Sequence, residues 1–251
     1  MPGKNDYIDV YPQDLESNEH ELDSRFNEVN EGADLGYGKR LPLILILDTS
    51  SSMNGRFDGV KAIDELNEGL KILKSEIMKN EIARFVVEPQ IITFGGMVNV
   101  LQDFTTIDNF TPPILKASGL TPLAEAINQG VDSLKNRLEA YDASGLDYYK
   151  SIIFLVTDGQ QEPKNPTMMD IAVKKVHAVN DICTFFPVGT ATANFNALQA
   201  FAVNQPVVEL MNMDFKAMFE FISRSVTIIS SSQPGQTLAL PPANCFKPIT
   251  A

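Results

Sequence analysis

Hydrophobic residues are arranged along this chain in two patterns, continuous runs and a spacing of three or four positions. Residues 41–47 and 151–156 are apolar at nearly every position, which is the pattern of parallel strands covered on both faces. In other segments, apolar residues recur every three or four positions, the spacing of amphipathic helices. Because such strands and helices alternate, we expect an α/β fold in which helices cover both faces of a doubly wound, mostly parallel sheet.

Two helices follow directly from the spacing of apolar residues. The first stripe begins at Phe57 and ends at Ile77, which predicts a helix of about six turns. A second stripe begins at Leu123, after two residues that are typical of a helix start. Thr121 is a good N-cap, and Pro122 is favoured at the first helical position.

One further strand is expected to form a hairpin at the edge of the sheet. Residues 85–94 predict a strand that is interrupted near Pro89. Gly95-Gly96 then predicts a turn, and we expect residues 97–101 to return as one antiparallel edge strand.

Composition divides the chain into three parts. Residues 1–38 hold ten acidic residues against two basic ones, a net charge of −8 out of −12 for the whole chain, and we expect a flexible acidic tail. Residues 39–230 carry the strand and helix patterns of one domain, and residues 231–251 are expected to form a Ser/Pro-rich C-terminal tail. With 44% hydrophobic residues among 251, the chain can build one substantial core.

Charge and cysteine usage narrow the function classes. A globally acidic chain without a basic stripe argues against nucleic-acid and anionic-membrane partners. The longest apolar run is far too short to cross a bilayer, and residues 1–11 are too polar for a secretory signal. Cys183 and Cys245 indicate no disulfide framework, so we expect a reducing, cytoplasmic setting.

Oxygen-bearing side chains gather where these elements begin or end. Asp48, Ser50 and Ser52 follow the first buried strand, Thr121 precedes the second helix, and Asp158 follows the second buried strand. In open α/β sheets, ligands bind at the carboxyl ends of the strands. If the two strands are neighbours, their carboxylates repel each other unless a cation lies between them. Hard oxygen ligands of this kind suit a small divalent cation such as Mg²⁺.

The order Asp-x-Ser-x-Ser, distant Thr, distant Asp resembles the metal-ion-dependent adhesion site of von Willebrand factor A (vWA) domains. The resemblance covers roughly residues 40–230 and predicts a vWA, Rossmann-like fold. Local strings are similar to those of the cytosolic bacterial branch associated with tellurite resistance and stress operons: RLPLILILDTSSSM, FGGMV, ASGLTPLAEAI, YYKSIIFLVTDG and FPVGT.

This resemblance implies a binding module and not an enzyme. Family members hold Mg²⁺ (or Mn²⁺ or Ca²⁺) by the Ser and Thr side chains, directly or through water, and by the two Asp mostly through water. An Asp or Glu of a partner protein takes the remaining position. Carried to this chain, the metal ligands are Asp48, Ser50, Ser52, Thr121 and Asp158. The implied function is a metal-dependent protein–protein interaction module, an adaptor in a bacterial stress-response, tellurium-resistance or defence system.

Two positions depart from the family pattern. Ser51 stands where Gly is common, and Gly permits backbone angles that Ser resists. The bacterial branch tends to carry another Asp shortly after Thr-Asp-Gly, where this chain has Gln160-Gln161-Glu162-Pro163. Glu162 could substitute for that Asp, or the loop could serve a different partner.

Each residue also has a simpler explanation. Asp and Ser cluster in loops and caps, Thr121 could act only as an N-cap, and Asp158-Gly159 could be only a turn. A hydrolase with a Ser nucleophile needs a base in reach, but His20 lies in the tail and His177 on a remote helix. The alternative function is Mg²⁺-dependent phosphoryl transfer with Asp48 as the nucleophile.

Overall fold

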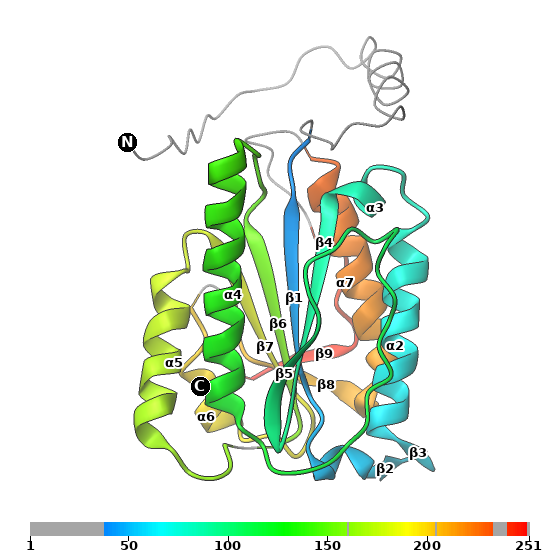
Figure 1. Ribbon diagram of the computed structural model, residues 1–251. Coiled ribbons are helices and arrows are strands. Elements are labelled where there is room, and N and C mark those ends of the chain that lie inside the picture. The colour runs from blue at the N-terminus through cyan, green and yellow to red at the C-terminus, as the bar shows by residue number, and fades with distance from the viewer. Residues whose placement is uncertain (1–37, 160, 204, 233–239, 250–251) are drawn as a thin grey trace.

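The computed structural model describes residues 38–159, 161–203, 205–232 and 240–249. A central sheet lies between two layers of helices (Figure 1). The acidic tail predicted for residues 1–38 lies outside the described residues except for Gly38, and so do residues 233–239 of the predicted C-terminal tail.

Seven strands form the sheet in the order β5-β4-β1-β6-β7-β8-β9. Their bounds are β1 Leu41–Asp48, β4 Val87–Gly95, β5 Met97–Gln102, β6 Ser151–Thr157, β7 Cys183–Gly189, β8 Val208–Leu210 and β9 Phe246–Pro248. The five inner strands run parallel, and the outer strands β5 and β9 are antiparallel to their neighbours. The predictions of a mostly parallel sheet and of an antiparallel edge strand after Gly95-Gly96 are confirmed.

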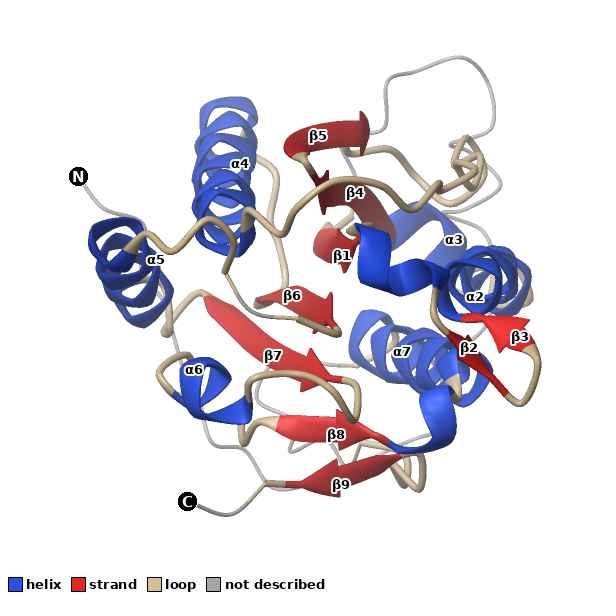
Figure 2. Ribbon diagram, turned by 90° about the horizontal axis from the view of Figure 1, so that it is seen from below, coloured by secondary structure: helices blue, strands red, loops and turns tan. Residues whose placement is uncertain are grey.

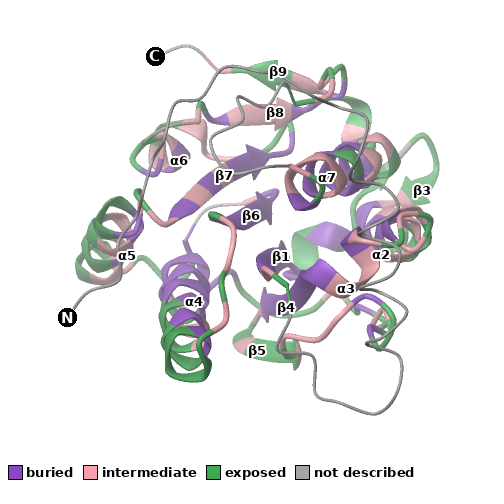
Figure 3. Ribbon diagram, turned by 90° about the horizontal axis from the view of Figure 1, so that it is seen from above, coloured by how far each residue is buried: buried purple, intermediate pink, exposed green. Residues whose placement is uncertain are grey.

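Helices cover both faces of this sheet, as predicted. One face carries α2 (Ala62–Ile77), α3 (Ala83–Val86) and α7 (Phe215–Ser230), and the other carries α4 (Leu123–Ser144), α5 (Pro166–Ala178) and α6 (Phe195–Gln199) (Figure 2). In β1, Leu43 and Leu45 pack on the first layer, and Ile44 and Ile46 on the second. The strand is continuously apolar because both of its faces are buried (Figure 3).

The helix predicted from Phe57 begins later, at Ala62. Before it, a 3-10 helix η1 (Ser51–Asn54) leads into a small hairpin of β2 (Arg56–Phe57) and β3 (Val60–Lys61). Asp58 and Gly59 form the turn of this hairpin with φ angles of 48° and 86°, a combination that matches the twist of paired strands. The helical start at Phe57 was therefore the wrong interpretation, because Asp-Gly favours the turn.

The strand that contains Pro89 is continuous and not interrupted there. β4 starts at Val87, after the short helix α3, and Pro89 lies opposite Leu43 of β1. β5 pairs with β4 only from Ile91 onward. Pro89 therefore has a neighbouring strand on one side alone, the situation in which strands tolerate proline.

The domain extends beyond the predicted boundary at residue 230. β9 pairs with β8, with Lys247 opposite Glu209, and Cys245 is 8% exposed within the core on the α2 and α7 face. A strand of three residues is too short to show a periodic pattern, so the Ser/Pro-rich composition concealed it. Both Cys183 and Cys245 are free and buried. None of the helices in the described ranges has the length and apolar character needed to cross a membrane.

Candidate metal centre

The carboxylates of Asp48 and Asp158 come from two adjacent strands at the same edge of the sheet. Asp48 is the last residue of β1, Asp158 directly follows β6, and β1 and β6 pair side by side. This edge is the lower end of the sheet in Figure 1. Asp48 is fully buried and Asp158 is 7% exposed. The structure thus brings together the two acidic residues that the sequence placed at strand ends.

One backbone amide and two serine hydroxyls connect the two carboxylates. The Ser50 N–H donates to Asp48 Oδ1 at 2.8 Å, and the Ser50 and Ser52 Oγ atoms lie 2.9 Å apart. Ser52 Oγ then donates to Asp158 Oδ1 at 2.7 Å. Ser50 is buried, whereas Ser52 is exposed. The chain of contacts therefore runs from the buried Asp48 to the protein surface.

Thr121 joins this group from the segment that precedes α4. A Cβ atom placed on Gly159 would lie 3.5 Å from Thr121 Oγ1 and 4.0 Å from Asp48 Oδ2. Both oxygens therefore border the same small space, which the absence of a side chain at Gly159 keeps open. All five residues predicted as metal ligands lie in one group.

Among the described residues, no cationic side chain balances the charge of this group. Burial raises the pKa of Asp48 to about 6, against hydrogen bonds from Ser50 and Thr157 that lower it, and the neighbouring Asp158 charge raises it further. Burial also raises the pKa of Asp158. None of the ion pairs within the described ranges includes Asp48 or Asp158. A cation from outside the chain would relieve this cost.

The donor set fits a hard divalent ion. It offers two carboxylates and three hydroxyls, and such oxygen donors suit Mg²⁺, Mn²⁺ or Ca²⁺. Nowhere in the described part of the chain, this edge included, do three His, Cys, Asp or Glu side chains gather to hold a metal ion; at this edge the three hydroxyls would supply the remaining donors. The residues present therefore fit the ion that the resemblance implies, at this edge of the sheet.

Thr157 also contributes to the candidate metal centre, although the sequence analysis did not predict it. Its Oγ1 donates to Asp48 Oδ2 at 2.6 Å, and the side chain is fully buried at the end of β6. The hydrogen bond fixes the Asp48 carboxylate against the neighbouring strand. A hydroxyl directly before Asp158, at the end of a buried strand, was the signal that could have identified it.

Thr121 is not the N-cap of α4, contrary to the prediction. The helix begins at Leu123, and Pro122 before it provides no side-chain cap. Instead, the Ala124 N–H donates to Gln161 Oε1 at 2.7 Å. The acceptor comes from a loop 37 residues away, so no local pattern around Thr121 could reveal it. Among the described residues, the Thr121 hydroxyl has no hydrogen-bond partner.

Two glycines allow three loops to meet at this edge. The Gly119 carbonyl accepts from the Ser51 N–H at 3.0 Å, and the Leu120 carbonyl accepts from the Gly96 N–H at 2.7 Å. Gly119 has a φ of +75°, and a Cβ atom there would lie 2.5 Å from Gly96 Cα. The segment before Thr121 can therefore pack on the β4–β5 turn only because both positions are glycine.

The two departures from the family pattern have different outcomes. Ser51 lies in η1 without a positive φ, so a residue with a side chain fits there. Glu162 is exposed, and its N–H donates to the Thr121 carbonyl at 2.9 Å. Gln160 lies outside the described residues. The loop after Asp158 is thus tied to the backbone of Thr121, while Gln161 holds the start of α4.

Comparison with solved structures identifies the fold. The pilus adhesin SpaC from Lactobacillus rhamnosus GG has a TM-score of 0.59 at 15% identity over 76% of this chain. A von Willebrand factor type A protein from Catenulispora acidiphila has a TM-score of 0.57 at 14% identity over 76%. The minor pilin PilB from Streptococcus sanguinis has a TM-score of 0.55 at 12% identity over 78%.

The matched regions span 31%, 43% and 63% of those three chains, so this chain corresponds to less than two thirds of each. No protein-family model and no curated protein matches the sequence. At these identities the likeness concerns the fold alone. The fold is that of vWA domains, as the sequence resemblance predicted.

Proposed function

We propose that this protein is a metal-dependent protein-interaction module, in which Asp48, Ser50, Ser52, Thr121 and Asp158 hold one divalent ion. The supporting observation is the pair of buried carboxylates on adjacent strand ends that the described part of the chain pairs with no cation. Mg²⁺ prefers octahedral coordination and keeps water where protein ligands are lacking. A bound ion would supply an electrophilic position that a partner carboxylate can fill.

The partner that this edge fits is a protein segment with an Asp or Glu next to an apolar side chain. Leu120 precedes Thr121 and is 54% exposed, and Met97, next to Gly96 on the adjoining turn, is 65% exposed. Exposed apolar side chains beside a site that recognises charge favour a partner offering both kinds of group. The adhesin and pilin structures that share the fold agree with a role in protein contacts, and the sequence resemblance adds a bacterial stress or tellurium-resistance setting.

The rival function is phosphoryl transfer with Asp48 as the nucleophile, which would require this fully buried carboxylate to reach a phosphate. Incubation with p-nitrophenyl phosphate and Mg²⁺ tests this rival, and hydrolysis that Asp48→Asn abolishes would favour it over binding.

Affinity capture from a lysate of the source organism tests the proposal itself. Three samples are compared by mass spectrometry: the wild type with Mg²⁺, the wild type with EDTA, and Thr121→Val with Mg²⁺. Ser75→Ala, which removes an exposed hydroxyl on α2, is the control. We expect a partner that is captured by the wild type and the control, and is lost both in EDTA and with Thr121→Val.

The purified partner then provides the decisive step. Exchange of one of its Asp or Glu residues for the amide should abolish the Mg²⁺-dependent binding. If every captured partner survives EDTA and Thr121→Val, the protein binds through another surface and the proposal is wrong.

A further inference from the structure

Gln161 is a buried polar side chain that connects the loop after β6 to the start of helix α4, beside the candidate metal centre. It is 8% exposed and lies in the loop between β6 and α5, three residues after Asp158. Its Oε1 accepts from the Ala124 N–H at 2.7 Å, and its Nε2 donates to the Pro163 carbonyl at 3.0 Å. Both ends of the amide are therefore used, one toward helix α4 and one within its own loop.

The first contact replaces a helix cap. The first amides of a helix have no partner within the helix, and a Ser or Thr side chain usually provides an acceptor for one of them. Thr121 lies three residues before Ala124, the spacing at which a Thr hydroxyl can accept from such an amide. In this protein Gln161 accepts from that amide instead, and the Thr121 hydroxyl remains available.

The loop that carries Gln161 also holds the backbone at Thr121. The Glu162 N–H donates to the Thr121 carbonyl at 2.9 Å. Asp158, at the start of the loop, accepts from Ser52. Displacement of this loop would therefore move a hydroxyl and a carboxylate of the candidate centre together.

We infer that Gln161 is a positioning residue for the metal centre: by capping α4 from a distant loop, it keeps the Thr121 hydroxyl directed to the ion. This inference rests on the proposed function. If Gln161 is lost, the Ala124 amide needs another acceptor, because an unpaired buried N–H is costly. Thr121 Oγ1, three residues earlier, is at the spacing of such an acceptor, and a hydrogen bond from the Ala124 amide would compete with its contact to the ion.

Magnesium titration calorimetry on the full chain tests the inference with two matched variants. Gln161→Met keeps the length of the side chain and removes both hydrogen bonds. Asn165→Ala removes the N-cap of α5, whose Oδ1 accepts from the Met168 N–H at 3.1 Å. Each variant deletes an acceptor at a helix start, so in EDTA each should lower the melting temperature by about 2–4 °C. Only Gln161→Met should weaken Mg²⁺ binding, by about tenfold, the lower end for groups that orient a ligand.

A double-mutant cycle separates positioning from general loosening. Thr121→Val removes the hydroxyl that Gln161 is inferred to release. In that background, Gln161→Met should change Mg²⁺ affinity by less than about twofold. The inference is overturned if Gln161→Met binds Mg²⁺ like the wild type or if Asn165→Ala loses as much affinity as Gln161→Met. It is also overturned if the affinity losses of Thr121→Val and Gln161→Met multiply in the double variant. Failure of the wild type to bind Mg²⁺, Mn²⁺ or Ca²⁺ would instead refute the proposed function on which the inference rests.

Discussion

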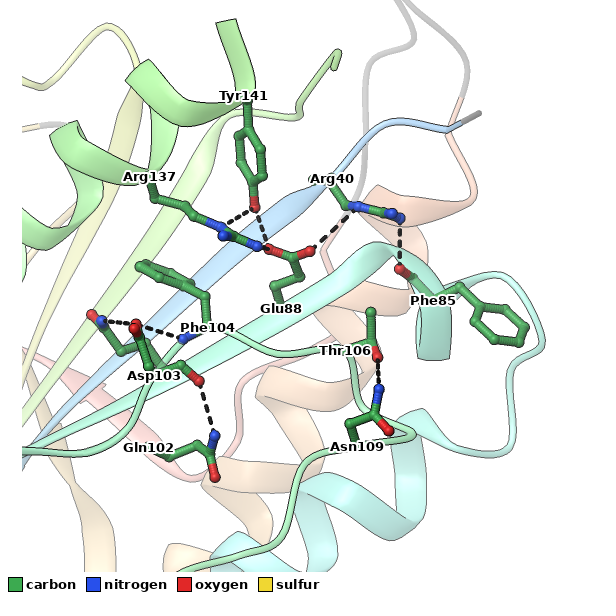
Figure 4. Close-up of polar contacts among 11 residues, drawn as sticks. Arg40, Phe85, Glu88, Gln102, Asp103, Phe104, Thr106, Asn109, Arg137 and Tyr141 are labelled. Carbon is green, nitrogen blue, oxygen red and sulfur yellow. Dashed lines mark hydrogen bonds and ion pairs between the residues drawn. The ribbon is translucent and has the colours of Figure 1, made fainter. Parts of the chain in front are cut away.

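Each end of the central sheet buries a carboxylate, but one carboxylate has charged partners and the other has neutral ones. At the amino end, Glu88 of β4 is 4% exposed and receives hydrogen bonds from Arg137 and Tyr141, while Arg40 Nε lies 3.3 Å from Glu88 Oε1 (Figure 4). At the carboxyl end, Asp48 is fully buried, and its hydrogen-bond donors within the described ranges are neutral, the Ser50 N–H and Thr157 Oγ1.

The difference shows what each end is built for. Burial and the Glu88 charge raise the pKa of Tyr141, so the phenol keeps the proton that it donates. At the amino end, the Glu88 charge is therefore paired within an ionic cluster that joins the start of β1 to β4 and α4. At the carboxyl end, burial raises the pKa of Asp48 to about 6, so its ionised form is costly until a cation arrives. A buried acid without an internal counter-charge distinguishes a candidate binding site from a structural ion pair.

Glu88→Gln should have the largest effect on stability and none on metal binding. The change removes the carboxylate charge that Arg40 and Arg137 share, and breaking a buried ion pair in this way costs about 3–5 kcal/mol. We expect about 3 kcal/mol, because Arg137 is 31% exposed. Urea unfolding measures the loss, and calorimetry should give the Mg²⁺ affinity of the wild type. A cost below about 1 kcal/mol would mean that the cluster is not the stabilising end.

The pH dependence of the free energy of unfolding in EDTA should show that ionised Asp48 destabilises the apoprotein, whereas Glu88 stabilises it. Because its folded pKa is raised from 3.8 to about 6, the contribution of this group is full below its unfolded pKa and is lost as the pH rises through about 6. Two pKa units correspond to about 3 kcal/mol as an order of magnitude. Asp48→Asn keeps both contacts, since its amide can accept from Ser50 and donate to Thr157.

The comparison is made by urea unfolding across the acidic to neutral range. The wild type should lose stability relative to Asp48→Asn as the pH rises, so that the variant is the more stable apoprotein near neutral pH. Saturating Mg²⁺ should restore the wild type and leave the variant unchanged. Parallel profiles for the two proteins in EDTA would contradict the assigned cost of burying Asp48.

Gly119→Ala tests whether the loop contacts set the geometry of the carboxyl end. Gly119 and Gly145 have similar φ angles, +75° and +67°, but only Gly119 would bring a Cβ against backbone, 2.5 Å from Gly96 Cα. Gly145→Ala should cost about 1–2 kcal/mol through its backbone conformation alone. Gly119→Ala should cost more and should also weaken Mg²⁺ binding about tenfold, as loss of ligand orientation does. Equal Mg²⁺ affinity in both variants would show that the loop at Gly119 does not set the geometry of the metal centre.

Leu120→Ser should have the smallest effect, and that effect should be limited to the affinity for the partner protein. Leu120 is 54% exposed, so the change should leave folding and Mg²⁺ affinity intact. Partial burial of a Leu side chain contributes about 1 kcal/mol, which predicts about fivefold weaker partner binding in biolayer interferometry. Ile114→Ser, in the same loop and 82% exposed, serves as the control. A similar loss with both variants would indicate a nonspecific apolar contribution.

The arrangement of the sheet and the meeting of Asp48 and Asp158 could be inferred from sequence for one physical reason. Strands buried on both faces are continuously apolar, so their ends are visible, and parallel strand ends converge at one edge. Asp48 and Asp158 were placed correctly on this basis. Ser50 and Ser52 belong to the junction after β1, whereas Thr121 was grouped with them through the resemblance to vWA domains.

The supporting contacts could not be inferred, because they join residues that are distant in the chain. Thr121-Pro122 has every local feature of a helix start, yet the acceptor for α4 is Gln161. Thr157 contacts Asp48 from the neighbouring strand, 109 residues away, and its place before Asp158 was the one local signal of this contact. The β9 strand is formed by pairing with β8 and not by its own composition. Tertiary contacts of this kind override local propensity.

Calorimetric titration of the wild type and of Asp48→Asn with MgCl₂ near neutral pH tests the central claim most directly. The claim is that the carboxyl end of the sheet lacks a cation that a divalent ion supplies. We expect the wild type to bind one Mg²⁺ per chain and Asp48→Asn, still folded by circular dichroism, to show no binding heat. A wild type that binds neither Mg²⁺ nor Mn²⁺ nor Ca²⁺, or a variant that binds them as the wild type does, would contradict the account.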